Sequence, residues 1–275
     1  MKRKTKRKPY ISFHPITLLV LISLFFYSCA EQEKDDTPWV PLFDGETLNG
    51  WTQKGGEAAY EVREGKIVGT TVSDTPNSFL TSDKMYGDFI LELEYMVDSS
   101  MNSGIQIRSN SHPYYRDGRV HGYQIEIDPS DRAWSAGIYD ESRRGWLHPI
   151  ADENTTAKQA FKQNDWNHYR IEALGDTLKT WINGIPASHL ADDQTESGFI
   201  GLQVHSIGKD QEPGTEIIWK NIRILTDSLE NYAQKSPLPL VDKTNQLTKN
   251  EADQGWKMLW DGKTTEGWRG ARSER

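Results

Sequence analysis

Three short segments of the sequence alternate apolar residues with glutamine, glutamate, arginine or histidine: residues 104–109, 122–128 and 198–205. Successive side chains of a β-strand point to opposite faces of a sheet, so residues two apart share a face. We therefore expect one sheet face to carry Gln106, Arg108, Gln124, Glu126, Asp128, Gln203 and His205. Acid, base and amide groups on one face can bind hydroxyl groups and transfer protons. The alternative is a solvated outer face with no catalytic task.

Glu126 and Asp128 raise two further kinds of chemistry. They lie one pleat repeat apart, ~6.6 Å along a strand, and retaining glycosidases present two carboxylates ~5–5.5 Å apart. The segment partly resembles the E-x-D-x-x-E strand of laminarinase-like glycosidases, but Asp131 stands at the sixth position and Pro129 would break the strand. With His205, the two carboxylates could instead bind a divalent metal ion, because imidazole and carboxylate groups suit Zn or Mn. A metal ion is the one cofactor that the sequence suggests.

Aromatic residues gather in the segments that connect these strands. Trp134, Tyr139 and Trp146 are our candidates for contact with substrate, because amphipathic rings at the rim of a polar sheet suit stacking on sugars. The alternative is that Trp134 and Trp146 only pack loops onto the edge of the sheet. The sequence has no nucleophile elbow, and no glycine-rich phosphate loop leads from a strand into a helix. Serine or cysteine nucleophiles and nucleotide cofactors therefore have no support.

Short stretches of period two, separated by Gly, Asn, Asp and Pro, run from Trp39 to Leu225. They predict an all-β fold, an antiparallel sandwich or barrel. An Asn-Gly pair at 183–184 predicts a hairpin. The predicted strands are Tyr60–Val68, Asp88–Val97, Gly104–Ser109, Gly122–Asp128, Asn167–Leu174, Leu178–Ile182, Gly198–His205 and Glu216–Leu225.

The N-terminal segment is predicted to be a targeting signal. Six Lys and Arg residues precede an apolar run at 16–27 that is too short to span a bilayer, and Cys29, the single cysteine, follows it. We expect residues 1–28 to be a lipoprotein signal peptide, Cys29 to be lipidated, and residues 29–37 to be an acidic tether; a plain signal peptide is the alternative. The protein would then be lipid-anchored to the outer membrane in the cell envelope, on its periplasmic or surface side.

Charge limits the partners of the remaining chain. The formal net charge is −8, and without the six basic residues of the leader it is −14. An acidic chain disfavours nucleic acid and anionic membrane surfaces as partners, so we expect membrane contact only through the lipid. The 275 residues allow one or two domains.

One internal repeat bears on the domain count. Residues 39–51 and 256–268 share Trp, Leu, Asp, Gly, Thr, Gly and Trp at an offset of 217 residues. We expect a β-sandwich at 38–226, a polar linker at 227–254, and the start of a truncated second copy of the same domain at 255–275.

Seven motifs, in order along residues 38–226, are similar to the 3-keto-disaccharide hydrolase family. They are Leu42-Phe-Asp-Gly45 with Leu48-Asn-Gly-Trp51, Asn102-Ser-Gly-Ile-Gln-Ile-Arg108, Gly122-Tyr-Gln-Ile-Glu-Ile-Asp128, Ala136-Gly-Ile-Tyr-Asp140, Trp166-Asn, Trp181-Ile-Asn-Gly184 and Gly201-Leu-Gln-Val-His205. The resemblance implies a concanavalin A-like jelly-roll β-sandwich. It also implies an enzyme that acts on 3-keto-glycosides or disaccharides as a 1,2-lyase, as a 3-keto-2-hydroxy-glucal hydratase, or as both in sequence.

The chemistry that this resemblance implies needs a base at C2, an acid at the leaving group and a cation for the enolate. Glu126 and His205 are our candidates for base and acid, and Arg108 for the cation unless a metal takes that part. Gln106, Gln124, Asp128 and Gln203 would bind substrate. A non-catalytic carbohydrate-binding lectin and a retaining glycosidase on unoxidised glycans are the alternatives.

Overall fold

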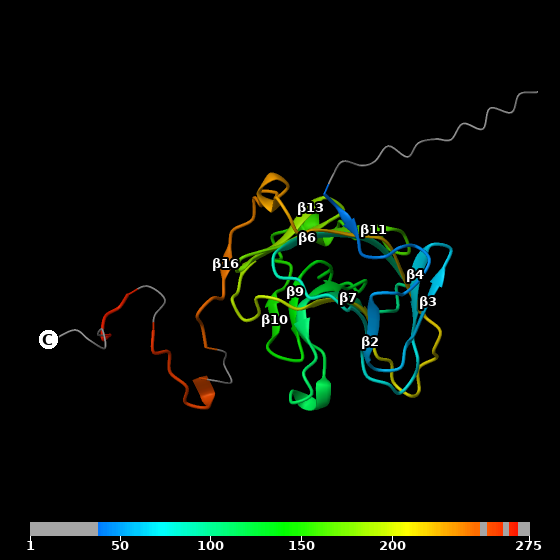
Figure 1. Cartoon of the computed structure of the whole chain (residues 1–275), viewed down its shortest axis with the longest axis horizontal. Helices are drawn as coiled ribbons and strands as arrows, with labels where there is room; N and C mark the ends of the chain where they lie inside the picture. Colours follow the sequence, from blue (N-terminus) through cyan, green and yellow to red (C-terminus); the bar gives the residue numbers. More distant parts are fainter. Residues whose placement is uncertain (1–37, 248–251, 261–263, 269–275) are drawn as a thin grey trace, which may run out of the picture. The chain divides into compact units, whose positions relative to one another are not determined.

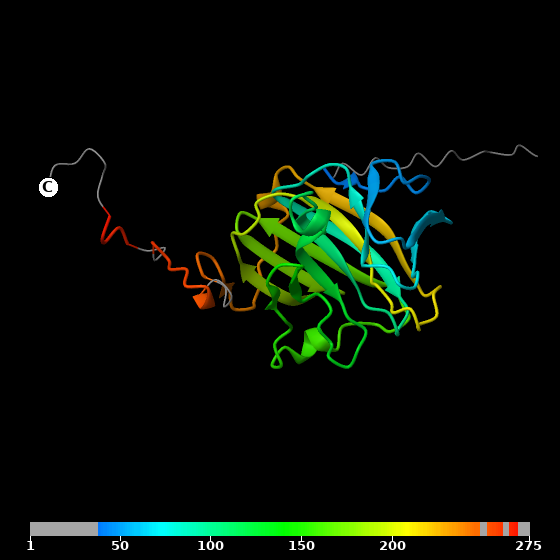
Figure 2. The ribbon, with the colours of Figure 1, turned by 90° about the horizontal axis from the view of Figure 1, so that it is seen from below.

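The computed structural model describes residues 38–247, 252–260 and 264–268, and two β-sheets stacked face to face dominate them (Figure 1). Figure 2 shows the strands of the sheets lying side by side. The nine-stranded sheet has the order β16 (Val241–Asp242), β13 (Ile185–Ala191), β12 (Thr177–Ile182), β11 (Asn167–Leu174), β6 (Phe89–Val97), β15 (Glu216–Leu225), β4 (Lys66–Thr70) and β3 (Ala59–Arg63), with β1 (Val40–Pro41) paired to β15. The seven-stranded sheet has the order β10 (Gly145–His148), β9 (Ile138–Glu141), β8 (His121–Ile127), β7 (Ser103–Asn110), β14 (Phe199–Val204), β5 (Ser78–Ser82) and β2 (Trp51–Gly55).

The described strands pair antiparallel, except for the parallel pair of β13 and β16. Short helices in the connections of the sandwich are η1 (Arg116–Gly118), α1 (Thr155–Lys158) and η2 (Leu229–Asn231). The predicted all-β fold, a concanavalin A-like jelly-roll β-sandwich, is confirmed.

The core lies between the two sheets and follows from alternation along the strands. Ile105, Ile125 and Leu202 come from the seven-stranded sheet, Leu93 and Trp219 from the nine-stranded one, and all five are fully buried. Burying one such side chain contributes about 1.5–3 kcal/mol. The apolar members of the alternating segments thus face inward and fix which side of each strand carries the polar groups.

Two details of the strand predictions have opposite outcomes. The Asn183-Gly184 hairpin is confirmed, with positive φ at both residues and Ile182 paired to Ile185. The single strand at Tyr60–Val68 is wrong, because Glu64 and Gly65 also adopt positive φ and turn the chain from β3 into β4. Seven strands were not predicted from the sequence: β1, β2, β5, β9, β10, β13 and β16, most of which have five residues or fewer.

Part of the predicted linker, residues 229–243, contacts the sandwich. Its backbone carbonyls at Tyr232 and Gln234 accept hydrogen bonds from Arg170 and Lys179, and β16 pairs with β13. These residues cover charged side chains on the outer face of the nine-stranded sheet, a role that a polar stretch without periodicity does not reveal.

Both copies of the repeated motif contain the same indole-to-carbonyl hydrogen bond. The Trp51 indole nitrogen donates to the Leu42 carbonyl at 2.9 Å, and Trp268 donates to Leu259 at 3.2 Å, again 217 residues on. Trp51 is 8% exposed whereas Trp268 is 57% exposed. The hydrogen bond is thus common to both copies, whereas only the first tryptophan is buried in a sandwich core.

The predicted signal peptide, Cys29 and the acidic tether lie outside the described residues and stay predictions. Within the described residues, no helix is long and apolar enough to cross a membrane.

Candidate functional site

A polar cavity of about 320 Å³ lies on the outer face of the seven-stranded sheet. Its wall combines strand residues with residues of the adjoining loops. They are Asn77, Asn102, Gln124, Glu126, Arg132, Tyr139, Glu141, Trp146, Gln203 and His205. We call it the Glu126 cavity. The structure thus brings together six of the residues that alternation and the aromatic pattern predicted for binding or catalysis, and Glu126 and His205 both line the cavity.

Buried amide side chains connect the floor of the cavity to Glu126. Gln106 and Gln203 both donate to Oε1 of Gln124, at 2.6 and 2.9 Å. Gln124 in turn donates from Nε2 to Glu126 at 3.0 Å. Gly104 makes room for this arrangement, because a Cβ at that position would lie 2.5 Å from the Gln124 side chain. The amide chain therefore delivers one oriented donor to the carboxylate.

Glu126 is buried, with 4% of its surface exposed, and no cation fully neutralises the charge of its carboxylate. Asn102 donates to Oε1 at 2.7 Å, and the Arg132 guanidinium is 3.4 Å from the same oxygen. Burial raises the pKa of Glu126 to about 7, and Asp128 adds to the effect, while the amides of Asn102 and Gln124 and the charge of Arg132 oppose it. A carboxyl group with this pKa can accept or donate a proton near neutral pH.

Arg132 is held beside Glu126 by a carboxylate and two indole rings. Its Nε donates to Asp128 at 2.8 Å, and its guanidinium lies 4.7 Å from the Trp134 ring centre and 5.2 Å from that of Trp146. Its Nη1 makes no hydrogen bond to a residue that the structure describes. Arg132 therefore offers a positioned cation with a free donor at the cavity.

His205 lies half-buried at the cavity wall. Its Nδ1 is 2.8 Å from the Ser206 carbonyl oxygen. A carbonyl can only accept, so Nδ1 carries the hydrogen in the neutral ring and Nε2 keeps its lone pair. The imidazole can thus act as a base through Nε2.

Two polar atoms at the cavity lack partners in the described chain. The Gln203 Oε1 is buried without a hydrogen bond, and the Tyr139 hydroxyl, half-buried at the wall, makes none either. Buried polar groups normally have partners, so the Gln203 oxygen is suited to accept a hydrogen bond from a hydroxylated ligand, and the Tyr139 hydroxyl can donate or accept one.

Arg108 does not lie at the cavity, contrary to the prediction. A β-bulge follows Ile107 in the pairing of β7 with β8, and Arg108 itself has a φ of 44°. The bulge changes which face the next side chain takes. Arg108 donates instead to the carbonyls of Gly87 and Gly175 and to Asp88, and it is 2% exposed. It is a buried structural arginine.

Three predicted binding residues lie behind the cavity wall. Gln106 is fully buried beneath Gln124, and Trp134 packs edge-on against Trp146 with 4.7 Å between ring centres. Asp128 accepts from Ser130, Arg132 and the Trp134 backbone. They position Gln124, Trp146 and Arg132 rather than line the cavity themselves.

The predicted metal site does not fit the geometry. Within the described residues, no three His, Cys, Asp or Glu side chains come close enough to hold a metal ion. Both Asp128 oxygens are already bonded to Arg132 and its neighbours, so the set of Glu126, Asp128 and His205 does not form a ligand group.

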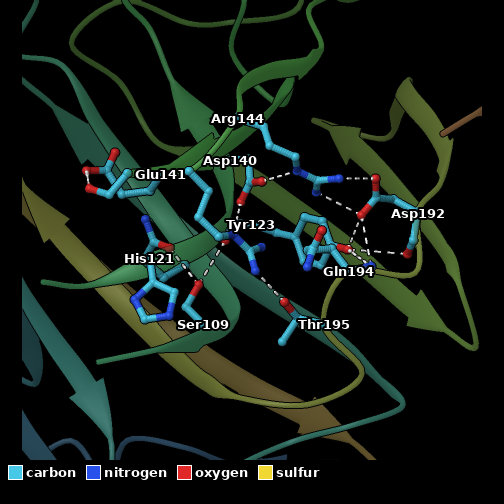
Figure 3. Close-up of polar contacts among 12 residues, drawn as sticks. Ser109, His121, Tyr123, Asp140, Glu141, Arg144, Asp192, Gln194 and Thr195 are labelled. Carbon is cyan, nitrogen blue, oxygen red and sulfur yellow. Dashed lines mark hydrogen bonds and ion pairs between the residues drawn. The ribbon is translucent and has the colours of Figure 1, made fainter. Parts of the chain in front are cut away.

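Four residues of the cavity were not predicted from the sequence: Asn77, Asn102, Arg132 and Glu141. Three of these residues precede or follow strands, where alternation gives no information. Glu141 ends the short strand β9 and pairs with Gly122, so its position depends on β8 across the sheet. Its neighbour Asp140 turns the other way and pairs with Arg143 and Arg144; Figure 3 shows Glu141 apart from this ion-pair network.

Comparison with known proteins agrees with this geometry. Residues 38–225 match the model of the 3-keto-alpha-glucoside-1,2-lyase-like domain. The chain belongs to this family. Membership supports a carbohydrate-related function, and the matched residues include every element that lines the Glu126 cavity. No curated protein matches the chain.

Several solved structures are similar to this chain at low identity. A proposed glycosyl hydrolase of Parabacteroides distasonis ATCC 8503 is 16% identical, with a TM-score of 0.49 over 69% of this chain and 94% of that one. A carbohydrate-binding module of Bacillus subtilis is 19% identical, with a TM-score of 0.44 over 63% and 93%. A Bacillus subtilis protein of unknown function with a galectin-like fold is 12% identical, with a TM-score of 0.49 over 68% and 94%.

Proposed function

We propose that the Glu126 cavity binds a 3-keto-glycoside and starts its cleavage by removing the proton at C2. The observation that carries this proposal is the buried Glu126 carboxyl, held by neutral amides, with a pKa raised to about 7 by burial. A ketone at C3 acidifies the C2 proton, which brings it within reach of such a base.

The other cavity residues fit the remaining demands of this reaction. Arg132 replaces Arg108 as the cation that stabilises the developing enolate, because its guanidinium lies beside Glu126 and has a free donor. Gln124 and Gln203 would bind sugar hydroxyls, and Trp146 and Tyr139 would flank the sugar ring. His205, with a basic Nε2, would activate the water that adds to the resulting C1–C2 double bond.

The first alternative, a retaining glycosidase, needs a second carboxylate about 5–5.5 Å from the first and ready to attack the sugar. Asp128 is the next carboxylate on the same face, but its oxygens already accept hydrogen bonds from Arg132, Ser130 and the Trp134 backbone. The second alternative, a lectin, would need hydroxyl-binding groups but no buried carboxyl of raised pKa.

A comparison of two substrates tests the proposal. The purified protein is incubated with one disaccharide and with its 3-keto derivative, and released sugar is quantified. We expect product from the oxidised form alone. Cleavage of the parent disaccharide would favour the glycosidase, and binding of both forms without product would favour the lectin.

The predicted lipid anchor at Cys29 and the cell-envelope location complete the proposal. Replacement of Cys29 by alanine should release the protein from the membrane fraction, and unchanged fractionation would contradict lipidation.

A further inference from the structure

A second cavity adjoins the Glu126 cavity and has a volume of about 390 Å³. Phe79 and Pro76 form one side, and the loop from Arg116 to Val120 forms the other. We call it the Arg119 cavity. Asn77 and Glu141 line both cavities, so the Glu141 carboxyl lies at their boundary. Small-molecule sites have volumes of about 300–1,000 Å³, so each cavity alone is near the lower end of that range.

The lining of the Arg119 cavity suits a second sugar-sized unit. Phe79, Val120 and Pro76 offer an apolar surface, which can face the C–H side of a sugar ring. Arg116 and Arg119 are exposed, and neither forms an ion pair within the described chain. Their guanidinium groups are therefore available as donors to sugar oxygens.

Glu141 differs from the other acidic residue of its strand. It is 9% exposed and accepts a hydrogen bond from the Ser142 hydroxyl at 3.0 Å, whereas Asp140 is ion-paired with two arginines. Burial raises the pKa of Glu141, although Ser142, Arg119 and His205 oppose that rise. The group can therefore hold a proton at a higher pH than an exposed glutamate.

We propose that the Arg119 cavity receives the leaving group of the glycoside and that Glu141 protonates its glycosidic oxygen. This inference rests on the proposed function. Glu126 takes the C2 proton, the C1–C2 double bond forms, and the bond from C1 to oxygen breaks with its electron pair on oxygen. The oxygen then takes the Glu141 proton and departs as an alcohol. One proton is gained and one is lost by the protein, so the step balances without a co-reactant.

Leaving-group dependence tests the role of Glu141. The wild type and Glu141→Gln are compared on three 3-keto-glucosides that carry nitrophenol, methanol or glucose as the leaving group. In Glu141→Gln, we expect kcat/KM to fall about 100-fold or more for the methanol and glucose leaving groups. Nitrophenolate needs little protonation, so the fall for the nitrophenol leaving group should be at least ten times smaller. Glu153→Gln, an exposed carboxylate outside both cavities, is the matched control and should behave as the wild type.

Each outcome has a distinct meaning. A uniform loss across the three leaving groups in Glu141→Gln, with an active wild type, overturns this inference and leaves the proposed function standing. A wild type that converts none of the three refutes the proposed function itself.

The cavity is tested separately with Arg119→Ala. We expect KM to rise about tenfold for the disaccharide relative to the methyl glycoside, because only the former reaches the Arg119 cavity. An equal change in KM for both substrates would overturn the assignment of the cavity.

Discussion

The two sheets each bury glutamates on their outer faces, but they satisfy them in opposite ways. On the nine-stranded sheet, Glu92 is ion-paired with Arg170 and Arg223 at 2.7 Å each, and Glu172 with Arg170 and Lys179 at 2.8 and 2.6 Å. On the seven-stranded sheet, Glu126 accepts from two neutral amides, and its one cationic neighbour, Arg132, lies 3.4 Å away.

This difference changes the proton affinity of the carboxyl groups. At Glu92, burial raises the pKa, but the hydrogen bonds and charges of Arg223 and Arg170 outweigh it, so the pKa is lowered. At Glu126, burial prevails and the pKa rises. A buried glutamate surrounded by cations is therefore a structural anion, whereas one surrounded by amides can exchange protons near neutral pH.

The largest expected effect is on turnover in Glu126→Gln. The amide keeps the shape of the side chain but cannot take a proton, so we expect kcat to fall about 10²–10⁴-fold. Glu92→Gln is the matched control on the other sheet, and its kcat should stay within about twofold of wild type. Steady-state kinetics on a 3-keto-glucoside measure both, and similar losses in the two variants would remove the functional distinction between the faces.

The arginines of the two faces should separate stability from activity. Arg170→Met leaves Glu92 and Glu172 with fewer partners in a buried setting, and we expect a loss of about 3 kcal/mol in the free energy of unfolding. Arg132→Met should lower kcat at least tenfold with a smaller loss of stability than Arg170→Met, because the Arg132 side chain is 42% exposed and Asp128 keeps its hydrogen bonds from Ser130 and the Trp134 backbone. Denaturant unfolding and kinetics on both variants check this, and a reversed pattern would contradict it.

The pH dependence of stability should have opposite signs at the two glutamates. The folded-state pKa of Glu126 is about 7 against an ordinary value of 4.5, so ionisation destabilises the fold as pH rises through that window. Glu126→Gln should therefore gain stability relative to wild type between pH 4.5 and 7, by on the order of 3 kcal/mol at most.

Glu92 has a lowered pKa, so its stabilising effect is present above its unfolded-state pKa and is lost as pH falls below that value. Glu92→Gln should thus be most destabilised at neutral pH and approach wild type in acid. The free energy of unfolding of both variants and of the wild type is measured from pH 3 to 8. Parallel pH dependence in the two variants would contradict the opposite signs expected for the two glutamates.

The smallest effect concerns residues 229–243, which cover the ion pairs of the nine-stranded sheet. A chain that ends at residue 226 loses the carbonyls that accept from Arg170 and Lys179, and we expect it to be about 2 kcal/mol less stable. A chain that ends at residue 247 keeps them and should match the full chain. Equal stability of both would show that this segment contributes nothing.

The sequence predicted the sandwich and most of one polar row because both depend on period two. Ile105 and Ile125 set the inner face, and Gln124 and Glu126 followed from them. Arg108 could not be placed, because a bulge breaks the alternation at a point where nothing local marks it. Arg132 and Glu141 owe their positions to a loop and to pairing with β8, which are tertiary features. The burial that raises the Glu126 pKa is likewise invisible in the sequence.

The most direct test of the account is the fate of the C2 hydrogen. A 3-keto-glucoside is converted by the wild-type protein in heavy water, and the product is analysed by NMR. If Glu126 removes the C2 proton, deuterium should appear at C2 of the hydrated product, and Glu126→Gln should show neither turnover nor incorporation. Turnover that retains the original hydrogen at C2 would contradict the elimination mechanism and the role assigned to Glu126.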